Sequence, residues 1–205
     1  MTTKSSLTHE QRITRKSVEK IKKTPSKLGT SRPASSSTLI SFLSTNARSL
    51  FNKMDELQHI TYRTNPLFIC ITESWCSHEE PDSLYSIDGY SLFRKDRLFW
   101  AGGGVLIYVQ DSQIEKATQL ADLDVHGSNE ELWIHIIPQF GSPLVVCCTY
   151  RPPQECHKKF LSKLDCSLRT ILAKFPGENI VITGDFNGKN KTWYSQDTTN
   201  VIGED

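Results

Sequence analysis

The chain has 205 residues, of which 37% are hydrophobic and 23% charged, a composition that suits one soluble domain with a sizeable core. No apolar run is long enough to span a bilayer, and the N-terminus lacks the apolar segment of a secretory signal. We therefore expect an intracellular protein, nuclear or cytoplasmic, with no membrane partner. The six cysteines form no C-x-x-C pair, so they are predicted to be reduced core residues and not zinc ligands or disulfides. They are Cys70, Cys76, Cys147, Cys148, Cys156 and Cys166.

Charge is spread unevenly along the chain. Residues 1–33 hold nine Lys/Arg against Glu10 and Glu19, a net charge of +7, and the remainder holds fifteen Lys/Arg against twenty-one Asp/Glu, a net charge of −6. Residues 1–37 are rich in Lys, Ser, Thr and Pro, which predicts a disordered basic arm before a domain at 38–205. Such an arm contacts nucleic acid in some chains and is a solvated tail in others. An acidic body that binds phosphate needs a metal ion to bridge the like charges.

The ordered part is predicted to begin with a β-α-β unit. Residues 39–45 form an apolar strand, and Leu50, Met54 and Leu57 recur at helical spacing, which predicts a helix over residues 51–62. Pro66 separates this helix from a second buried strand at residues 67–71. Both strands end in polar side chains.

The middle of the chain reads as strands and turns. Alternation predicts a strand at residues 90–94, and an apolar run predicts another at 105–109. Glycines 102–104 between them lack the Lys-Ser/Thr of a phosphate-binding loop, so we interpret them as a flexible loop. Residues 132–136 and 144–150 flank a Gly-Ser-Pro turn and predict a β-hairpin, in which His135 has a structural role.

The last predicted elements are a helix and a strand. Apolar residues recur at helical spacing over residues 160–175, and Pro176-Gly177 ends the helix. Residues 180–182 then predict a buried strand that leads to Gly184, Asp185 and Asn187. A carboxylate and an amide two residues apart point to the same side of an extended chain and suit a phosphate or a hydrated divalent cation. The alternative is a simple Asx-type turn.

Polar residues at the ends of four strands form the candidate site, because the edge of a sheet brings distant sequence positions together. Each has a structural alternative: a capping carboxylate for Glu73, a sheet-edge aromatic for Tyr150 and a loop amide that bonds its own backbone for Asn46. The set comprises Asn46, Glu73, Tyr150, Arg151, Asp185 and Asn187.

Six short motifs in order carry a resemblance to a known family. They are Thr45-Asn46-Ala47-Arg48-Ser49-Leu50, Thr72-Glu73-Ser74-Trp75, the segment from Gly89 to Arg97, Gly102-Gly103-Gly104-Val105, Tyr150-Arg151-Pro152-Pro153 and Gly184-Asp185-Phe186-Asn187. Over about residues 40–193 the chain resembles the endonuclease/exonuclease/phosphatase family, and within it the apurinic-like endonuclease domain of non-LTR (LINE-type) retrotransposons. The resemblance implies a DNase I-like, four-layered α/β sandwich with the site at one sheet edge.

The resemblance also implies roles for matching positions. Glu73, with Asn46, would hold Mg²⁺ or Mn²⁺, and Asn46 would orient the site or its water. Tyr150 would contact the scissile phosphate, Asp185 would act on the attacking water and Asn187 would hold a phosphate oxygen. Arg97 and Arg151 would lie near the DNA backbone. In the family's complete members, the nick in DNA exposes a 3′-hydroxyl that primes reverse transcription.

One departure from the family pattern concerns its closing Ser-Asp-His. The sequence contains no such motif, and no histidine follows His157. We therefore expect a truncated domain with an incomplete second sheet and little activity. Three functions stay open at this point: a DNA endonuclease, a phosphatase or lipid phosphodiesterase of the same fold, and an inactive remnant that only binds nucleic acid.

Overall fold

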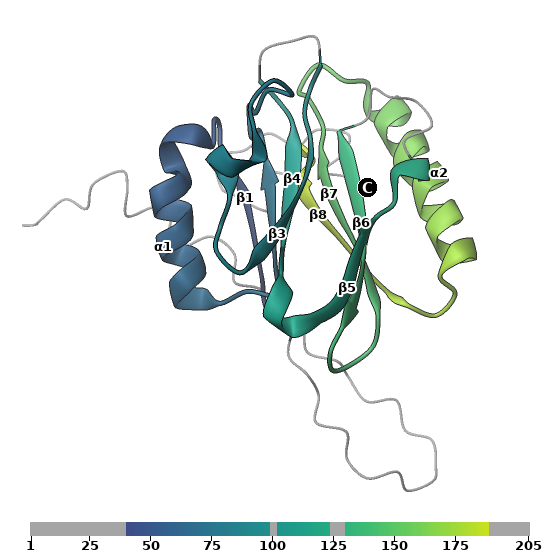
Figure 1. The fold of residues 1–205 in the computed structure, drawn as a ribbon. Coiled ribbons are helices and arrows are strands. Elements are labelled where there is room, and N and C mark those ends of the chain that lie inside the picture. Colours follow the sequence, from purple (N-terminus) through teal and green to yellow (C-terminus); the bar gives the residue numbers. More distant parts are fainter. Residues whose placement is uncertain (1–39, 99–101, 124–129, 189–205) are drawn as a thin grey trace, which may run out of the picture.

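Two four-stranded sheets face each other between two long helices (Figure 1). The computed structural model describes residues 40–98, 102–123 and 130–188; the predicted arm at residues 1–37 and the segment after residue 188 lie outside the described residues. The first sheet has the order β1-β2-β4-β3, with β1 at Phe42–Asn46, β2 at Phe68–Thr72, β4 at Val105–Gln110 and β3 at Tyr90–Lys95. The second has the order β5-β6-β7-β8, with β5 at Ile114–Gln119, β6 at Glu131–Pro138, β7 at Leu144–Tyr150 and β8 at Asn179–Asp185.

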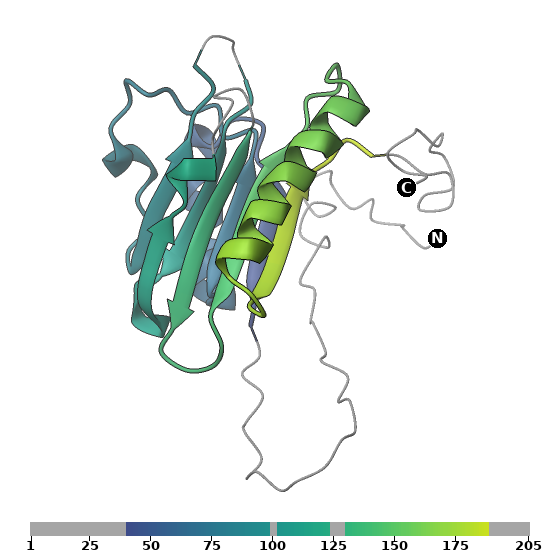
Figure 2. The same ribbon diagram turned by 90° about the vertical axis from the view of Figure 1, so that its right-hand side faces the viewer.

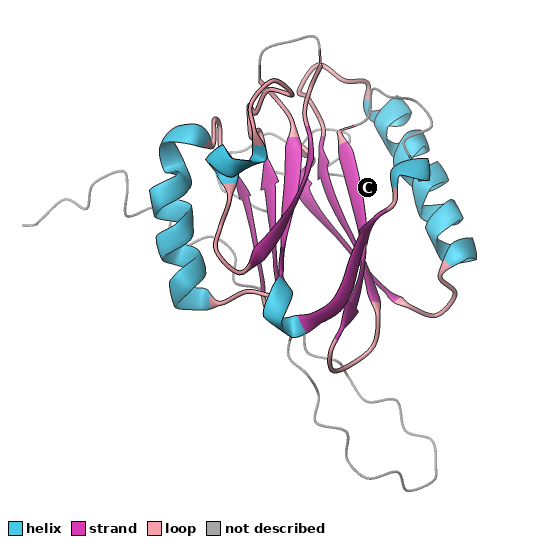
Figure 3. Ribbon diagram, viewed as in Figure 1, coloured by secondary structure: helices cyan, strands magenta, loops and turns pink. Residues whose placement is uncertain are grey.

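The helices cover the outer faces of the two sheets (Figure 3). Helix α1, Met54–Thr64, packs on the first sheet, and helix α2, His157–Lys174, packs on the second, where Figure 2 shows it in front of β8 and β7. Short 3₁₀ turns complete the chain, namely η2 at Phe51–Lys53, η3 at Asp82–Tyr85, η4 at Asp111–Gln113 and η5 at Ala121–Leu123. The fold is thus the predicted four-layered α/β sandwich. No helix in the described ranges is both long and apolar enough to cross a membrane.

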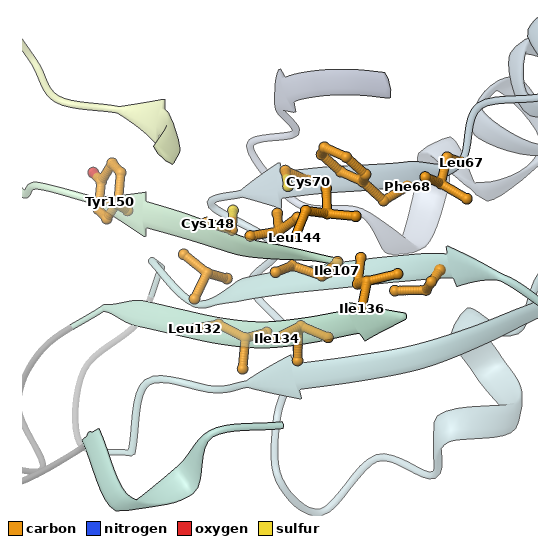
Figure 4. Packing of buried hydrophobic residues seen from close by; sticks show 13 residues of the cluster. Leu67, Phe68, Cys70, Ile107, Leu132, Ile134, Ile136, Leu144, Cys148 and Tyr150 are labelled. Atoms are coloured by element: carbon orange, nitrogen blue, oxygen red, sulfur yellow. The ribbon is translucent and has the colours of Figure 1, made fainter. Parts of the chain in front are cut away.

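Alternation along the strands builds these layers. In β2, Phe68 and Cys70 point into the core between the sheets, whereas Ile69 and Ile71 point toward α1. In β7, Val146 and Cys148 join the inter-sheet core, which Figure 4 shows with Tyr150 at one end of the cluster. Because both faces of these inner strands are covered, their sequences read as nearly continuous apolar runs. The core therefore fixes the strand ends that carry the polar residues.

Several element predictions are confirmed and a few are wrong. Strand β2, the β6–β7 hairpin and the parallel β1–β2 unit are as expected, whereas β5, with its mostly exposed pattern, was not predicted. The strand at residues 180–182 was expected to be buried, but all of β8 is only partly buried. In the described sheet β8 pairs with β7 alone, so one of its edges lacks a ladder partner there. Cys156 and Cys166 are exposed, contrary to the prediction that all six cysteines lie in the core.

Candidate active site

Strand register aligns the predicted polar residues at one edge of the sandwich. In the parallel β1–β2 pair, Asn46 lies opposite Thr72, the residue before Glu73. In the parallel β7–β8 pair, Tyr150 lies opposite Asp185. The two pairs belong to different sheets, and a hydrogen bond of 2.8 Å from the Thr183 hydroxyl to the Ser44 hydroxyl links β8 to β1 just before the site.

The side chain of Asn46 connects two carboxylates from the two sheets. Its amide nitrogen Nδ2 donates to Glu73 Oε1 at 2.7 Å and to Asp185 Oδ2 at 2.8 Å. Glu73 and Asp185 are separated by more than one hundred residues in sequence, and one amide group holds both. The convergence expected from the strand ends is therefore present for Asn46, Glu73 and Asp185.

Asn46 and Asp185 also form the Asx-type turns that were the alternative to a site. Asn46 Oδ1 accepts a hydrogen bond of 3.1 Å from the Arg48 backbone N–H, and Asp185 Oδ1 accepts one of 2.9 Å from the Asn187 backbone N–H. Each side chain thus uses one atom to close an Asx-type turn and the other to face its neighbours. The turn fixes the rotation of the group that faces the site.

Backbone strain is concentrated at this edge. Six non-glycine residues in the described ranges have positive φ, and five of them follow β1, β2 or β8, while the sixth, Asn65, caps α1. The five are Arg48 (φ 44°), Ser49 (74°), Glu73 (50°), Trp75 (57°) and Asn187 (47°). Left-handed conformations of such residues persist only where surrounding contacts impose them, and they cluster at functional sites. The strain at this edge therefore agrees with the site predicted there, in addition to the turns that the same residues form.

Gly184 is required for Asp185 to reach the site. Its φ is +144°, and a Cβ added there would lie 1.8 Å from the carbonyl oxygen of Thr149 on the neighbouring strand. No side chain fits at that distance, so only glycine lets β8 run against β7 in this register.

Tyr150 sits between Glu73 and a buried ion pair. Burial, together with the charge of Glu73 and a hydrogen bond to it, raises the pKa of the Tyr150 hydroxyl to about 12, so the phenol stays protonated at neutral pH. The Arg97 guanidinium lies over the ring, 5.8 Å from its centroid. Arg97 in turn pairs with Glu130, through Nε at 2.7 Å and also through Nη2. Tyr150 is therefore held as a hydrogen-bond donor beside the carboxylates.

The remaining predicted residues, Arg151 and Asn187, face one another at the edge of this group. Asn187 Nδ2 donates to the Arg151 carbonyl at 2.6 Å. Arg151 itself is only 9% exposed, and its guanidinium donates to the carbonyl of Glu155 at 2.8 Å. Arg151 thus joins the end of β7 to the start of α2, and its guanidinium does not face the Asn46 amide.

Sequence reasoning missed Glu130, which organises the glycine loop. Its Oε2 accepts from the Gly104 backbone N–H at 2.7 Å, and burial raises its pKa although Arg97 and that N–H lower it. Carbonyls of Gly103 and Gly104 accept from Trp75 and Ser74 at 2.9 and 3.2 Å. The loop predicted to be flexible is therefore bonded to the segment after Glu73. The only sign of Glu130 in the sequence was its position directly before the apolar strand β6.

The donor set fits a hard divalent cation. Glu73 and Asp185 meet on one neutral donor, and within the described ranges neither forms an ion pair with a basic side chain. The two carboxylates provide oxygen ligands of the kind that Mg²⁺ and Mn²⁺ prefer, with water completing the shell. Asn46, which was predicted to help hold the metal, turns its nitrogen Nδ2 to the carboxylates and its oxygen Oδ1 to the Arg48 N–H, so in this arrangement it positions the two acids and does not present its oxygen to an ion. No group of three or more His, Cys, Asp or Glu gathers as a metal site in the part of the chain described. Any ion held here would therefore use few protein ligands, as Mg²⁺ commonly does.

Comparison with known proteins agrees with this geometry. Residues 144–204 match a family model described as endonuclease-reverse transcriptase. Solved structures with the same fold include an AP endonuclease from Leishmania major, the endonuclease domain of the telomere-specific non-LTR retrotransposon TRAS1, and the catalytic domain of APE2 from Xenopus laevis. A comparison with curated protein sequences finds no significant match.

The solved structures are distant in sequence and longer than the matched region. The Leishmania enzyme is 20% identical with a TM-score of 0.55, and the match covers 72% of this chain and 55% of that protein. For TRAS1 the values are 16%, 0.58, 80% and 67%, and for APE2 they are 18%, 0.59, 80% and 64%. The resemblance to the endonuclease/exonuclease/phosphatase family and its DNase I-like fold is confirmed, and the chain spans little more than half of the Leishmania enzyme.

Proposed function

We propose that this chain is a metal-dependent phosphodiesterase domain that nicks DNA, as an endonuclease of the non-LTR retrotransposon type. The observation that carries the proposal is the Asn46 amide, which holds carboxylates from both sheets at 2.7 and 2.8 Å. Strained backbone at the same strand ends supports it. The match of residues 144–204 to an endonuclease-reverse transcriptase family favours DNA over a lipid substrate.

The roles follow from the contacts. Glu73 would hold the cation, and Asn46 keeps Glu73 and Asp185 in their relative positions. When bound, Mg²⁺ or Mn²⁺ offsets phosphate charge and stabilises the charge that develops during hydrolysis. Asp185 accepts a proton from the attacking water, because its Oδ2 faces the site while Oδ1 is held by the Asn187 N–H.

Two further groups face the phosphate in this scheme. Tyr150, protonated at neutral pH, donates its hydroxyl to a phosphate oxygen. Asn187, whose amide donates to the Arg151 carbonyl, lies two residues after Asp185 and is the group that the resemblance assigns to a phosphate oxygen. Arg97 and Glu130 act behind Tyr150 and fix its ring.

Activity of the 205 residues alone is expected to be weak. The sequence contains no Ser-Asp-His, the motif that the resemblance implies for holding the scissile phosphate. Groups that act as a unit lose most of the rate when one is missing. The test therefore needs two forms of the protein: this chain, and this chain extended by the carboxyl-terminal segment of the TRAS1 endonuclease domain.

Nicking of supercoiled plasmid with Mg²⁺ decides the proposal. We expect the extended chain to nick, Glu73→Ala to lower the rate by about 10³-fold, and Glu79→Ala, an exposed glutamate, to leave it unchanged. Robust nicking by the unextended chain would show that the closing motif is dispensable. Failure of both forms to nick DNA, or hydrolysis of a lipid phosphodiester in its place, would contradict the proposal.

A further inference from the structure

Trp75 is a strained and exposed tryptophan beside the candidate site. It lies two residues after Glu73, its φ is 57°, and it is 49% exposed. Ser74 between them is buried, so the chain turns Ser74 inward and leaves Trp75 at the surface. A tryptophan with left-handed backbone is uncommon, and such strain is kept where the side chain has a task.

The indole is held in place along one edge. The Trp75 backbone N–H donates to the Gly103 carbonyl at 2.9 Å. A Cβ added at Gly102 would lie 3.4 Å from Trp75 Nε1, so the ring runs along backbone that carries no side chain. The glycine loop thus supports one edge of the indole and leaves about half of the residue open to solvent. A ring fixed in this way loses little freedom when it binds a flat partner.

We propose that Trp75 stacks on an unpaired nucleobase next to the scissile phosphate, and that the preferred substrate is DNA with one nucleotide outside the duplex stack. This inference rests on the proposed function. Indole faces bind bases in a way that tolerates any sequence. Within a continuous duplex, neighbouring base pairs already cover both faces of each base. Only an unstacked base offers a free face to a side chain fixed on the protein.

The surroundings of Trp75 suit a nucleic acid. Glu73, two residues away in sequence, is in the group that we propose to bind the phosphate, and Trp75 is bonded to the glycine loop that Glu130 holds near Tyr150, so Trp75 and the proposed phosphate site share one edge of the sandwich. Arg48 is exposed at the same edge, and its backbone N–H donates to Asn46 Oδ1, so a basic residue adjoins the site. Aromatic rings interleaved with basic side chains are typical of surfaces that bind single-stranded nucleic acid.

Equilibrium binding of two DNAs tests the inference. The probes are a fluorescein-labelled 20-base-pair duplex and the same duplex with one unpaired thymidine, measured by anisotropy with the 205-residue chain in EDTA so that no cleavage occurs. We expect the unsubstituted chain to prefer the DNA with the unpaired base by about tenfold. Trp75→Ala removes the preference, and Trp75→Phe retains most of it.

Two controls isolate stacking from folding. Phe140→Ala changes an aromatic residue that is 77% exposed in the turn between β6 and β7, which leads into the opposite end of β7 from Tyr150, and is expected to keep the preference. Trp75→Leu keeps apolar bulk against the glycine loop without an aromatic face and is expected to lose it. If circular dichroism shows that Trp75→Ala does not fold, Trp75→Leu tests on its own whether the preference needs an aromatic ring.

The outcomes separate the two proposals. Equal binding of both DNAs by the unsubstituted chain, or a preference that survives in the Trp75→Leu variant, would overturn the inference and leave the proposed function standing. If neither DNA binds in EDTA, the measurement is repeated with Mg²⁺, because the proposed function needs a cation between the carboxylates and the phosphate. Absence of binding there as well would contradict the proposed function and the inference together.

Discussion

Two carboxylates lie near the Tyr150 ring, and their charges are satisfied in opposite ways. Glu130 is paired with Arg97 through two guanidinium nitrogens and accepts the Gly104 N–H. Glu73 is bound by the neutral Asn46 amide, which also holds a second carboxylate, Asp185. Glu130 therefore has its charge balanced within the protein, whereas Glu73 and Asp185 are close together without a basic partner among the described residues. Under the proposed function, Glu130 is a supporting carboxylate, and Glu73 and Asp185 are the ones that a cation would balance.

The largest effect is expected from Gly184→Ala, because Gly184 allows the close approach of β8 to β7 that brings Asp185 near Glu73. The added Cβ meets the Thr149 carbonyl at 1.8 Å, so β7 and β8 must separate. We expect the free energy of unfolding to fall by about 4 kcal/mol, from backbone strain and steric overlap together. Urea denaturation measures this change.

Gly177→Ala is the matched control for Gly184→Ala. Gly177 also has a left-handed φ of +80°, but nothing lies within 4 Å of its added Cβ. The cost at Gly177 is therefore only the strain of a left-handed residue that carries a Cβ, about 1 kcal/mol. Equal losses for the two variants would show that close approach of β7 does not explain Gly184.

Truncation to alanine at Glu130 and at Glu73 tests the difference between the two carboxylates. Glu130→Ala leaves the Arg97 guanidinium and the Gly104 N–H without their acceptor and is expected to cost about 3 kcal/mol in free energy of unfolding. Glu73→Ala in EDTA is expected to change it by less than about 1 kcal/mol, because lost hydrogen bonds are offset by removal of a like charge near Asp185. A larger loss for Glu73→Ala than for Glu130→Ala would contradict the distinction.

Mg²⁺ is expected to stabilise the chain through Glu73 and Asp185 and not through Glu130. Mg²⁺ at ten times its dissociation constant stabilises a site by about 1.4 kcal/mol through mass action. Thermal unfolding of the unsubstituted chain should therefore shift upward with Mg²⁺. Variants Glu73→Ala and Asp185→Asn should lose the shift. The exposed-site variant Glu79→Ala should keep it, and a shift that survives in Glu73→Ala would place the ion elsewhere.

The sequence supports prediction of the fold and the acids of the site, but not of their partners. Apolar runs ending in Glu73 and Asp185 specify strands and their polar ends, because alternation and burial are local properties. The Glu130–Arg97 pair joins residues 33 positions apart, and nothing local distinguishes it from exposed charges nearby. β5 is mostly exposed, has neither strict alternation nor an apolar run, and so gives too weak a pattern to predict. The exposure of β8 depends on which strands flank it, which is a property of the assembled sheet.

The smallest effect concerns pH and contrasts two partly buried acids, Glu130 and Glu80, whose pKa values shift in opposite directions. Burial raises the pKa of Glu130 above its usual 4.5, against the lowering by Arg97, whereas the Ser77 N–H and the Tyr85 hydroxyl lower the pKa of Glu80. The folded chain therefore binds the Glu130 proton more tightly than the unfolded chain does. Its contribution to stability is fully present below pH 4.5 and decreases as pH rises through the raised pKa. For Glu80 the contribution is present above pH 4.5 and is lost as pH falls.

Urea unfolding at several pH values between about 3 and 7 distinguishes these two behaviours, because the Glu130 effect develops above pH 4.5 and the Glu80 effect below it. The loss in free energy of unfolding caused by Glu130→Ala should grow as pH falls, and the loss caused by Glu80→Ala should shrink. An ion pair that dominated at Glu130 would instead lower its pKa and reverse the first trend. If the Glu130→Ala loss shrinks toward pH 4.5, Arg97 controls the charge of Glu130 more strongly than burial does. The supporting carboxylate would then be stabilised mainly by its charge, and the pair behind Tyr150 would weaken in acid instead of strengthening.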